Sequence, residues 1–287
     1  MYVAAASSAL RPMLAGPARP AELLGLSRVA LYLKAPGQPG VLVVLCHDAV
    51  RLPCGLLLAT TSAEMPLTSL APQAACPASF MVGDGAVSWL GPAGPVVVRA
   101  AREWAPVRSA QGEVAASALA AVRSVLGGAA WSGADPGIDD RAVASLADAA
   151  RDYHASLAVA ARLLGSGPGL TPSGDDVLAG FLAGAAAFGL EAAALRQAVA
   201  DLAPARTTAL SAALLWHAAR GECIDELAAV SAVLTGQGGR PEEAGRIASR
   251  LLSVGHTSGA ALAMGLMIAA EKAAGRQPML AKKGRAA

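Results

Sequence analysis

The feature that most constrains the fold of this chain is a change of sequence texture near Ser109. From about Arg28 to Val107 the apolar residues form short runs, such as VLVVLCH and PVVVRAA, separated by Gly and Pro. Runs of this kind, joined by the turn-like segments APGQPG and LGPAGP, predict strands of a small antiparallel sheet or barrel. Beyond Ser109 the segments are long, rich in Ala and Leu, and apolar every three to four positions, which predicts helices.

We therefore predict an α+β fold with two domains: a β-rich N-terminal domain over residues 1–108 and a larger all-helical domain over residues 109–287. A chain of 287 residues with 54% hydrophobic residues has enough apolar material for two packed units. Because aromatic residues make up only 3%, Ala, Leu and Val must fill the interior. The periodicity predicts helices over residues 112–126, 139–164, 174–188, 190–202, 207–220, 223–235, 241–253 and 257–274.

Charge and cysteine usage argue against several classes of partner. The net charge is only +2, and the one basic cluster is Lys282, Lys283 and Arg285, so no basic face is available for nucleic acid. The four cysteines lie far apart without a C-x-x-C pair, which indicates neither a zinc site nor a disulfide framework: Cys46, Cys54, Cys76 and Cys223. We expect a reducing, cytoplasmic location.

One segment has the length of a membrane span. Leu251 to Ala270 contains no Lys, Arg, Asp or Glu over twenty residues. Its first half carries His256 and several hydroxyls, and the apolar part that follows is only about twelve residues long. We therefore predict a buried core helix here and no membrane association. The alanine-rich N-terminus lacks the basic start of a secretory signal.

The densest chemical signal is Gly165 to Asp176, GSGPGLTPSGDD, which precedes an apolar helical segment. Ser173 fits the N-cap of that helix with Asp176 three residues later, so a capping role is one interpretation. The other is a ligand site, because glycines let a backbone approach a ligand and a helix N-terminus favours anions. The predicted substrate-binding residues of this segment are Gly167, Gly169, Thr171, Ser173 and Gly174.

The two acids of this segment complicate the binding of a bare anion. Asp175 and Asp176 would repel it unless they hold a metal ion, orient an amide N–H group or act as a general base. We predict both as catalytic residues. No cofactor is certain, and Mg²⁺ held by these two carboxylates is the one candidate.

Two further helix starts combine hydroxyls with a residue that can act on an anion. Gly255 to Gly259, GHTSG, contains His256, which could transfer a proton and is the third predicted catalytic residue, although a structural donor role is equally open. Arg206 can clamp a carboxylate or phosphate, although the hydroxyls after it are also typical caps. The further predicted substrate-binding residues are Arg206, Thr207, Thr208, Thr257 and Ser258. We hypothesise that all three helix starts converge on one pocket.

The same segments resemble a known family. GSGPGLTPSGDDVLAGF at Gly165 to Phe181 is similar to the signature of the oxamate carbamoyltransferase subunit AllH family, and TTALSAALLWHAARGE and GHTSGAALAMG resemble its later segments. The β-rich part resembles it only in general pattern.

The resemblance implies a subunit of an enzyme of purine or allantoin breakdown that converts oxalurate and phosphate into oxamate and carbamoyl phosphate. Its partners would be a ligase-type subunit similar to the FdrA proteins and a third subunit. Two alternatives stay open at this point: a non-catalytic scaffold subunit, and a small-metabolite sensor or carrier that uses the same pocket without turnover.

Overall fold

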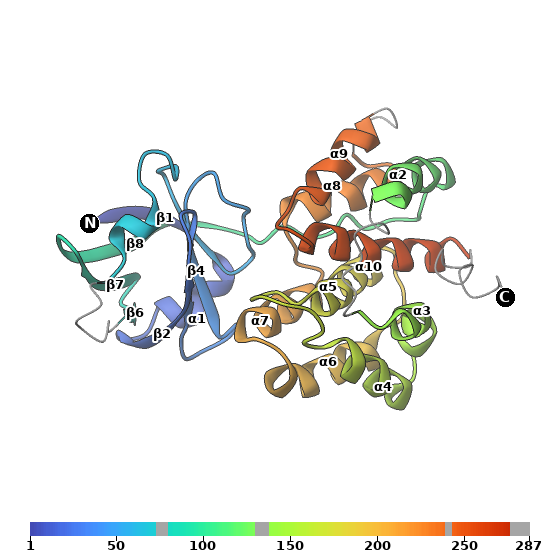
Figure 1. The fold of residues 1–287 in the computed structure, drawn as a ribbon, viewed down its shortest axis with the longest axis horizontal. Helices are drawn as coiled ribbons and strands as arrows, with labels where there is room; N and C mark the ends of the chain where they lie inside the picture. Colours follow the sequence, from blue (N-terminus) through green and yellow to red (C-terminus); the bar gives the residue numbers. More distant parts are fainter. Residues whose placement is uncertain (73–79, 130–137, 239–242, 276–287) are drawn as a thin grey trace. The chain divides into compact units, whose positions relative to one another are not determined.

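The computed structural model describes residues 1–72, 80–129, 138–238 and 243–275, and the chain divides into two compact units, Met1–Pro106 and Val107–Ala287 (Figure 1). The first unit consists of strands with short helical turns, and the second consists of helices. The predicted α+β class, with a β-rich barrel followed by a larger helical part, is confirmed. Cys76 and the basic cluster Lys282, Lys283 and Arg285 lie outside the described residues.

In the described part of the first unit, eight strands close into a barrel in the order β1-β5-β4-β3-β2-β6-β7-β8. Two pairings, β1 with β8 and β4 with β5, are parallel, and the others are antiparallel. The strand bounds are β1 Tyr2–Ser7, β2 Arg19–Leu26, β3 Ala30–Lys34, β4 Val41–Leu45, β5 Gly55–Leu58, β6 Phe80–Gly83, β7 Ala86–Gly91 and β8 Gly94–Trp104.

The apolar runs of the sequence form the interior of this barrel. Every residue of β4 is buried, as a continuous apolar run predicts for a strand covered on both faces. The LGPAGP segment is a hairpin turn, because Gly91 of β7 pairs with Gly94 of β8. β1, β2 and β6 were not predicted, since YVAAAS and RPAELLGL lack a clear alternation and FMVG is only four residues long.

A short helix, α1 Arg11–Leu14, follows β1, and the second unit holds the remaining helices. Their bounds are α2 Ala116–Ala129, α3 Asp140–Ala149, α4 Tyr153–Leu163, α5 Ser173–Ala187, α6 Ala193–Arg206, α7 Ala209–Ala218, α8 Asp225–Leu234, α9 Ala244–Leu252 and α10 Ser258–Ala273. The single helix predicted over 139–164 is wrong. The chain breaks before α4 because the Asp152 carboxylate accepts the Ala155 N–H at 2.8 Å and starts a new helix.

The centre of the helical unit is the close pairing of α5 with α10, which is red in Figure 1. A Cβ at Gly180 would collide with the Leu262 carbonyl oxygen, and one at Gly265 with the Val177 carbonyl oxygen. Glycine is therefore required where the two backbones meet, and almost every residue of α5 is buried. This pairing places the starts of both helices in the same region of the unit.

The apolar stretch Leu251–Ala270 comprises the end of α9, a turn and most of α10. Within the described residues, no helix combines the length and apolarity that a membrane crossing requires.

Candidate functional site

The glycine-rich segment forms a loop between α4 and α5 whose backbone requires glycine at several positions. Gly165, Gly167 and Gly169 have φ angles of 76°, 111° and 89°, in the left-handed region that side chains disfavour. Gly165 also lies so close to the carbonyl oxygen of Arg206 that an added Cβ would collide with it. The loop is thus held against the end of α6, next to the start of α7.

The Asp175 carboxyl fixes this arrangement. It is 2% exposed, and its Oδ1 accepts the Gly165 N–H at 2.9 Å while its Oδ2 accepts the Thr207 hydroxyl. Burial raises the pKa of Asp175, and hydrogen bonds from Thr207, Gly165 and Ser211 act in the opposite direction. With both oxygens engaged, Asp175 ties the loop to the residues between α6 and α7.

The neighbouring Asp176 is in a different state. It is 5% exposed, and its Oδ2 has no hydrogen-bond partner in the described structure. The pKa of Asp176 is raised to about 8: burial raises it most, a hydrogen bond with Ser258 lowers it, and the negative charge of Asp175 raises it. At neutral pH this carboxyl is therefore mostly protonated and uncharged.

Hydroxyl contacts bring the starts of the three helices together. Thr171 Oγ1 lies 3.0 Å from Ser258 Oγ, and the Ser173 hydroxyl donates to Thr257 at 3.1 Å, which joins the loop to the start of α10. The Thr208 hydroxyl donates to the Leu170 carbonyl at 2.6 Å, which joins it to the start of α7. We call these residues, together with Asp175, Asp176, Thr207 and Ser211, the polar cluster.

The N-terminus of α5 differs from the prediction. The N-cap residue is Pro172, and Ser173 is the first helical residue, so its hydroxyl points to Thr257 instead of capping. The N–H of Gly174 donates to the Ser166 carbonyl at 2.9 Å, and those of Asp175 and Asp176 donate to Pro172. These three N–H groups of the first turn of α5 are therefore engaged within the chain and are not available to an anion.

The loop before α5 leaves other N–H groups open. No backbone carbonyl among the described residues accepts the N–H of Gly167, Gly169 or Leu170. Gly169 and Leu170 are exposed, and Gly167 is half-buried. Successive N–H groups around glycines with positive φ are typical of anion-binding turns, so this outer face of the loop is where an oxyanion could bind.

Two predicted residues lie at the edge of the polar cluster. Arg206 does not open a helix, because it is the last residue of α6, and Thr208 caps α7 by accepting the Ser211 N–H at 3.0 Å. Arg206 and His256 are both exposed, and their side chains make no hydrogen bond or ion pair with described residues. Arg206 and His256 are thus sequence neighbours of the cluster residues Thr207 and Thr257, but their side chains do not bond to the cluster. The predicted set also omitted Ser211, which its position three residues after the Thr208 cap could have indicated.

The carboxyls do not fit a magnesium site. Both oxygens of Asp175 already accept hydrogen bonds, which leaves one unpartnered oxygen on an uncharged Asp176. Mg²⁺ requires near-octahedral oxygen ligands and binds through ionised carboxylates. Nor does the described part of the chain bring three or more His, Cys, Asp or Glu side chains together for a metal ion.

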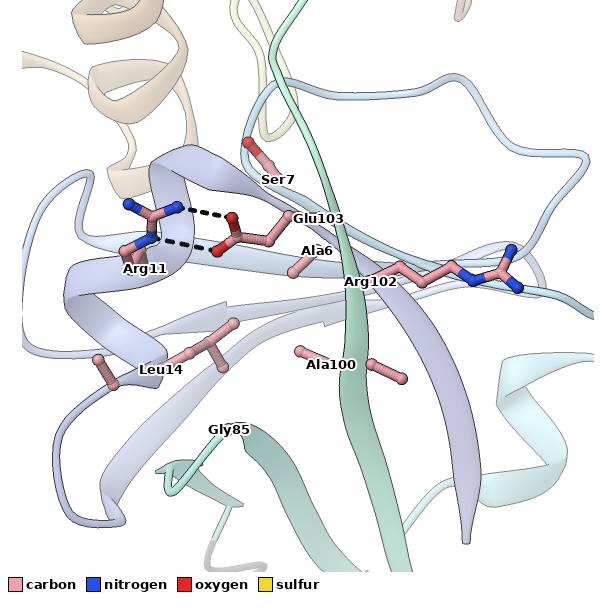
Figure 2. Close-up of a pocket in the computed structure, with 10 residues that line it drawn as sticks. Ala6, Ser7, Arg11, Leu14, Gly85, Ala100, Arg102 and Glu103 are labelled. Carbon is pink, nitrogen blue, oxygen red and sulfur yellow. Dashed lines mark hydrogen bonds and ion pairs between the residues drawn. The ribbon is translucent and has the colours of Figure 1, made fainter.

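Two surface cavities are lined by residues outside the polar cluster. One, of about 300 Å³, is on the barrel beside Arg11 and Glu103, which form an ion pair at 2.6 Å, while Arg102 extends away from that pair (Figure 2). The other, of about 430 Å³, is lined by α3 and α4 between small side chains such as Ala149 and Ala155. Because Arg11 is already paired, the barrel cavity offers no free charge from that residue.

Residues 163–270 match the family model of the oxamate carbamoyltransferase subunit AllH. The resemblance seen in the glycine-rich segment is confirmed over this range, which begins at the end of α4 and ends within α10. It contains the whole polar cluster and leaves the barrel outside. Neither a curated protein nor a solved structure matches the chain.

Proposed function

We propose that the chain is a subunit of a carbamoyltransferase-type enzyme that acts on small anionic amides, with the polar cluster as its substrate site. The observation that carries this proposal is the position of the AllH match, residues 163–270, which coincides with the segments that the cluster joins. The chain thereby resembles the family where its polar side chains meet.

The proposed reaction is the transfer of a carbamoyl group from oxalurate to phosphate. A phosphate oxygen attacks the carbamoyl carbon, the bond from that carbon to the amide nitrogen of the oxamate part breaks, and the nitrogen leaves with its electron pair and takes up a proton. The products are carbamoyl phosphate and oxamate. All four compounds are anions, so a site for them needs hydrogen-bond donors and little net negative charge.

The segments that form the polar cluster offer such donors in three places. The open N–H groups of Gly167, Gly169 and Leu170 would hold one oxyanion, and exposed Arg206 would bind a carboxylate or phosphate bidentately. His256, also exposed, would transfer the proton to the leaving nitrogen. Asp175 has the role of positioning the loop, since both of its oxygens are engaged and neither is available as a base.

We further propose the partners that the resemblance implies: a ligase-type subunit similar to the FdrA proteins and a third subunit, in purine or allantoin catabolism in the cytoplasm. The test is to mix oxalurate with phosphate and to measure carbamoyl phosphate, first with the purified chain and then with the three subunits together. We expect turnover with the complex, and Arg206→Ala and His256→Ala each to lower it at least tenfold.

Matched controls are available on α4 and just before it. Arg151→Ala and His154→Ala remove the same side chains from exposed positions outside the cluster and should leave turnover unchanged. Unchanged turnover in both Arg206→Ala and His256→Ala would contradict the proposed site. A complex without turnover, whose melting temperature none of the four compounds shifts, would contradict the proposed reaction.

One observation favours a second candidate function. Most hydroxyls of the cluster bind one another or a backbone carbonyl, as in Thr171 with Ser258 and Thr208 with Leu170. A hydrogen-bond network with a purely structural role would show the same pairing. The chain would then be a non-catalytic scaffold subunit. In that case cluster variants would weaken assembly of the complex, as measured by gel filtration, in proportion to their loss of turnover.

A further inference from the structure

Two adjacent carboxyls of α5 are held in opposite ways. Asp175 accepts hydrogen bonds on both oxygens, from Gly165 and Thr207, so its requirements are met within the chain. Asp176 has a hydrogen bond with Ser258 but leaves Oδ2 buried and without a partner. An unpartnered oxygen on a side chain that is 5% exposed is costly for the free protein, and such groups concentrate at ligand sites.

The surroundings of Asp176 favour its uncharged form. The ionised form would be buried beside the Asp175 carboxylate with a single hydrogen-bond donor, Ser258 from α10, and the pKa is raised accordingly. Two basic residues occur in the neighbouring segments, His256 just before α10 and Arg206 at the end of α6. Both are exposed, and neither bonds to Asp176.

We propose that Asp176 binds the substrate directly: as a neutral acid, its unpartnered carboxyl oxygen donates a hydrogen bond to an oxygen of an anionic carboxylate or of a carbamoyl group. This inference rests on the proposed function and names the ligand chemistry of the site. It also explains how a segment with two adjacent acids accepts an anion. Asp176 is kept uncharged by its surroundings, and the charge of Asp175 is stabilised by the hydrogen bonds that its two oxygens accept.

Through Ser258 the Asp176 side chain is joined to a pair of hydroxyls, those of Thr171 and Ser258. Both residues are half-buried, their oxygens lie 3.0 Å apart, and Ser258 also bonds to Asp176. A ligand oxygen that separates this pair would meet two hydroxyls and the Asp176 acid together. Since the single hydroxyl proton of Ser258 stays in its hydrogen bond to Asp176, the hydroxyl of Thr171 and the acid of Asp176 can each donate one hydrogen bond to the ligand. Two donors suit a planar group with two oxygens, such as a carboxylate.

The test measures binding of oxamate by isothermal titration calorimetry between pH 6 and pH 9, using the full chain. Oxamate keeps one negative charge throughout this range, so any pH dependence comes from the protein. Because only the acid form donates, the dissociation constant should be nearly constant up to pH 7 and rise about tenfold by pH 9. Asp176→Asn keeps an N–H donor and should bind oxamate with a constant affinity across the range.

Two further variants complete the test. Asp176→Leu keeps the approximate shape, removes the donor and should weaken binding at least tenfold at pH 6. Asp140→Asn makes the same chemical change as Asp176→Asn at an exposed position and should follow the wild type. Oxamate binding that is independent of pH, or unchanged in Asp176→Leu, would overturn the role of Asp176 and leave the proposed function standing. No binding of oxamate by the wild type at any pH would overturn both.

Discussion

The neutral state of Asp176 has a consequence for stability that can be measured without any ligand. Asp176→Asn replaces a buried carboxyl by an amide of nearly the same shape. The amide oxygen can still accept from Ser258, and the amide nitrogen takes the place of the unpartnered oxygen. The essential difference is that the amide carries no charge at any pH.

The sign and size of the effect follow from the pKa values of the two states. The pKa of Asp176 is about 8 in the folded protein, against an ordinary value of 3.8. The unfolded chain therefore releases this proton above about pH 4, while the folded chain retains it until about pH 8. Asp176 thus disfavours the folded state increasingly as the pH rises through this window. About four pKa units at 1.36 kcal/mol each set a ceiling of roughly 5–6 kcal/mol.

Only part of this range is accessible to experiment. Between pH 5 and pH 8, linkage predicts that the free energy of unfolding of Asp176→Asn rises relative to the wild type by about 3–4 kcal/mol. A constant offset of about 1–3 kcal/mol from the buried amide group would shift both ends equally and leave the rise intact. The prediction therefore concerns how the difference in the free energy of unfolding between Asp176→Asn and the wild type changes with pH, and not its value at any one pH.

The assay is urea unfolding at pH 5, 6, 7 and 8, followed by far-ultraviolet circular dichroism at 222 nm, because this signal reports mainly the helical unit. Asp140→Asn, at an exposed position, should keep a constant difference from the wild type. A difference between Asp176→Asn and the wild type that stays within about 0.5 kcal/mol over this range would refute the reasoning.

Three further outcomes are expected in urea unfolding experiments. Thr207→Val removes the hydroxyl that donates a hydrogen bond to Asp175 and should lower the free energy of unfolding by about 1–3 kcal/mol. Thr207→Ser keeps a hydroxyl and should lower it much less; equal losses in the two variants would refute the hydrogen bond. Gly265→Ala should cost about 3 kcal/mol or more, because its Cβ would collide with the Val177 carbonyl. Gly169→Ala has open space around its Cβ but a φ of 89°, so it should cost only about 1–3 kcal/mol; a loss larger than that of Gly265→Ala would contradict the packing.

Much of the architecture was accessible from the sequence because local patterns decide it. The predictions of β4 from its continuous apolar run and of the hairpin turn at Gly91 and Gly94 were correct, since burial and turn chemistry act over a few residues. β1 could not be predicted because its pairing depends on residues distant in the chain: it lies between β8 and β5 in the barrel. The break before α4 depended on the capping by Asp152, a local signal that the helical periodicity on both sides obscured.

The sequence indicated which segments form the candidate site, but not the hydrogen bonds within it. Hydroxyls and glycines at three helix starts predicted where polar groups gather, and the structure joins those segments through pairs such as Thr171 with Ser258. The sequence could not separate the two acids, because the difference between Asp175 and Asp176 comes from Thr207, more than thirty residues away. Nor could it show that three N–H groups in the first turn of α5 already donate to carbonyls, as that of Gly174 does to Ser166.

The most direct test of the shared site is hydrogen–deuterium exchange of the full chain with and without oxamate and phosphate. We predict slower exchange in the presence of these ligands at residues 165–176, 206–211 and 255–259 together, and unchanged exchange in the barrel. Slower exchange in only one of these segments, or around Arg11 and Glu103 on the barrel instead, would contradict a single substrate site built by the three helix starts.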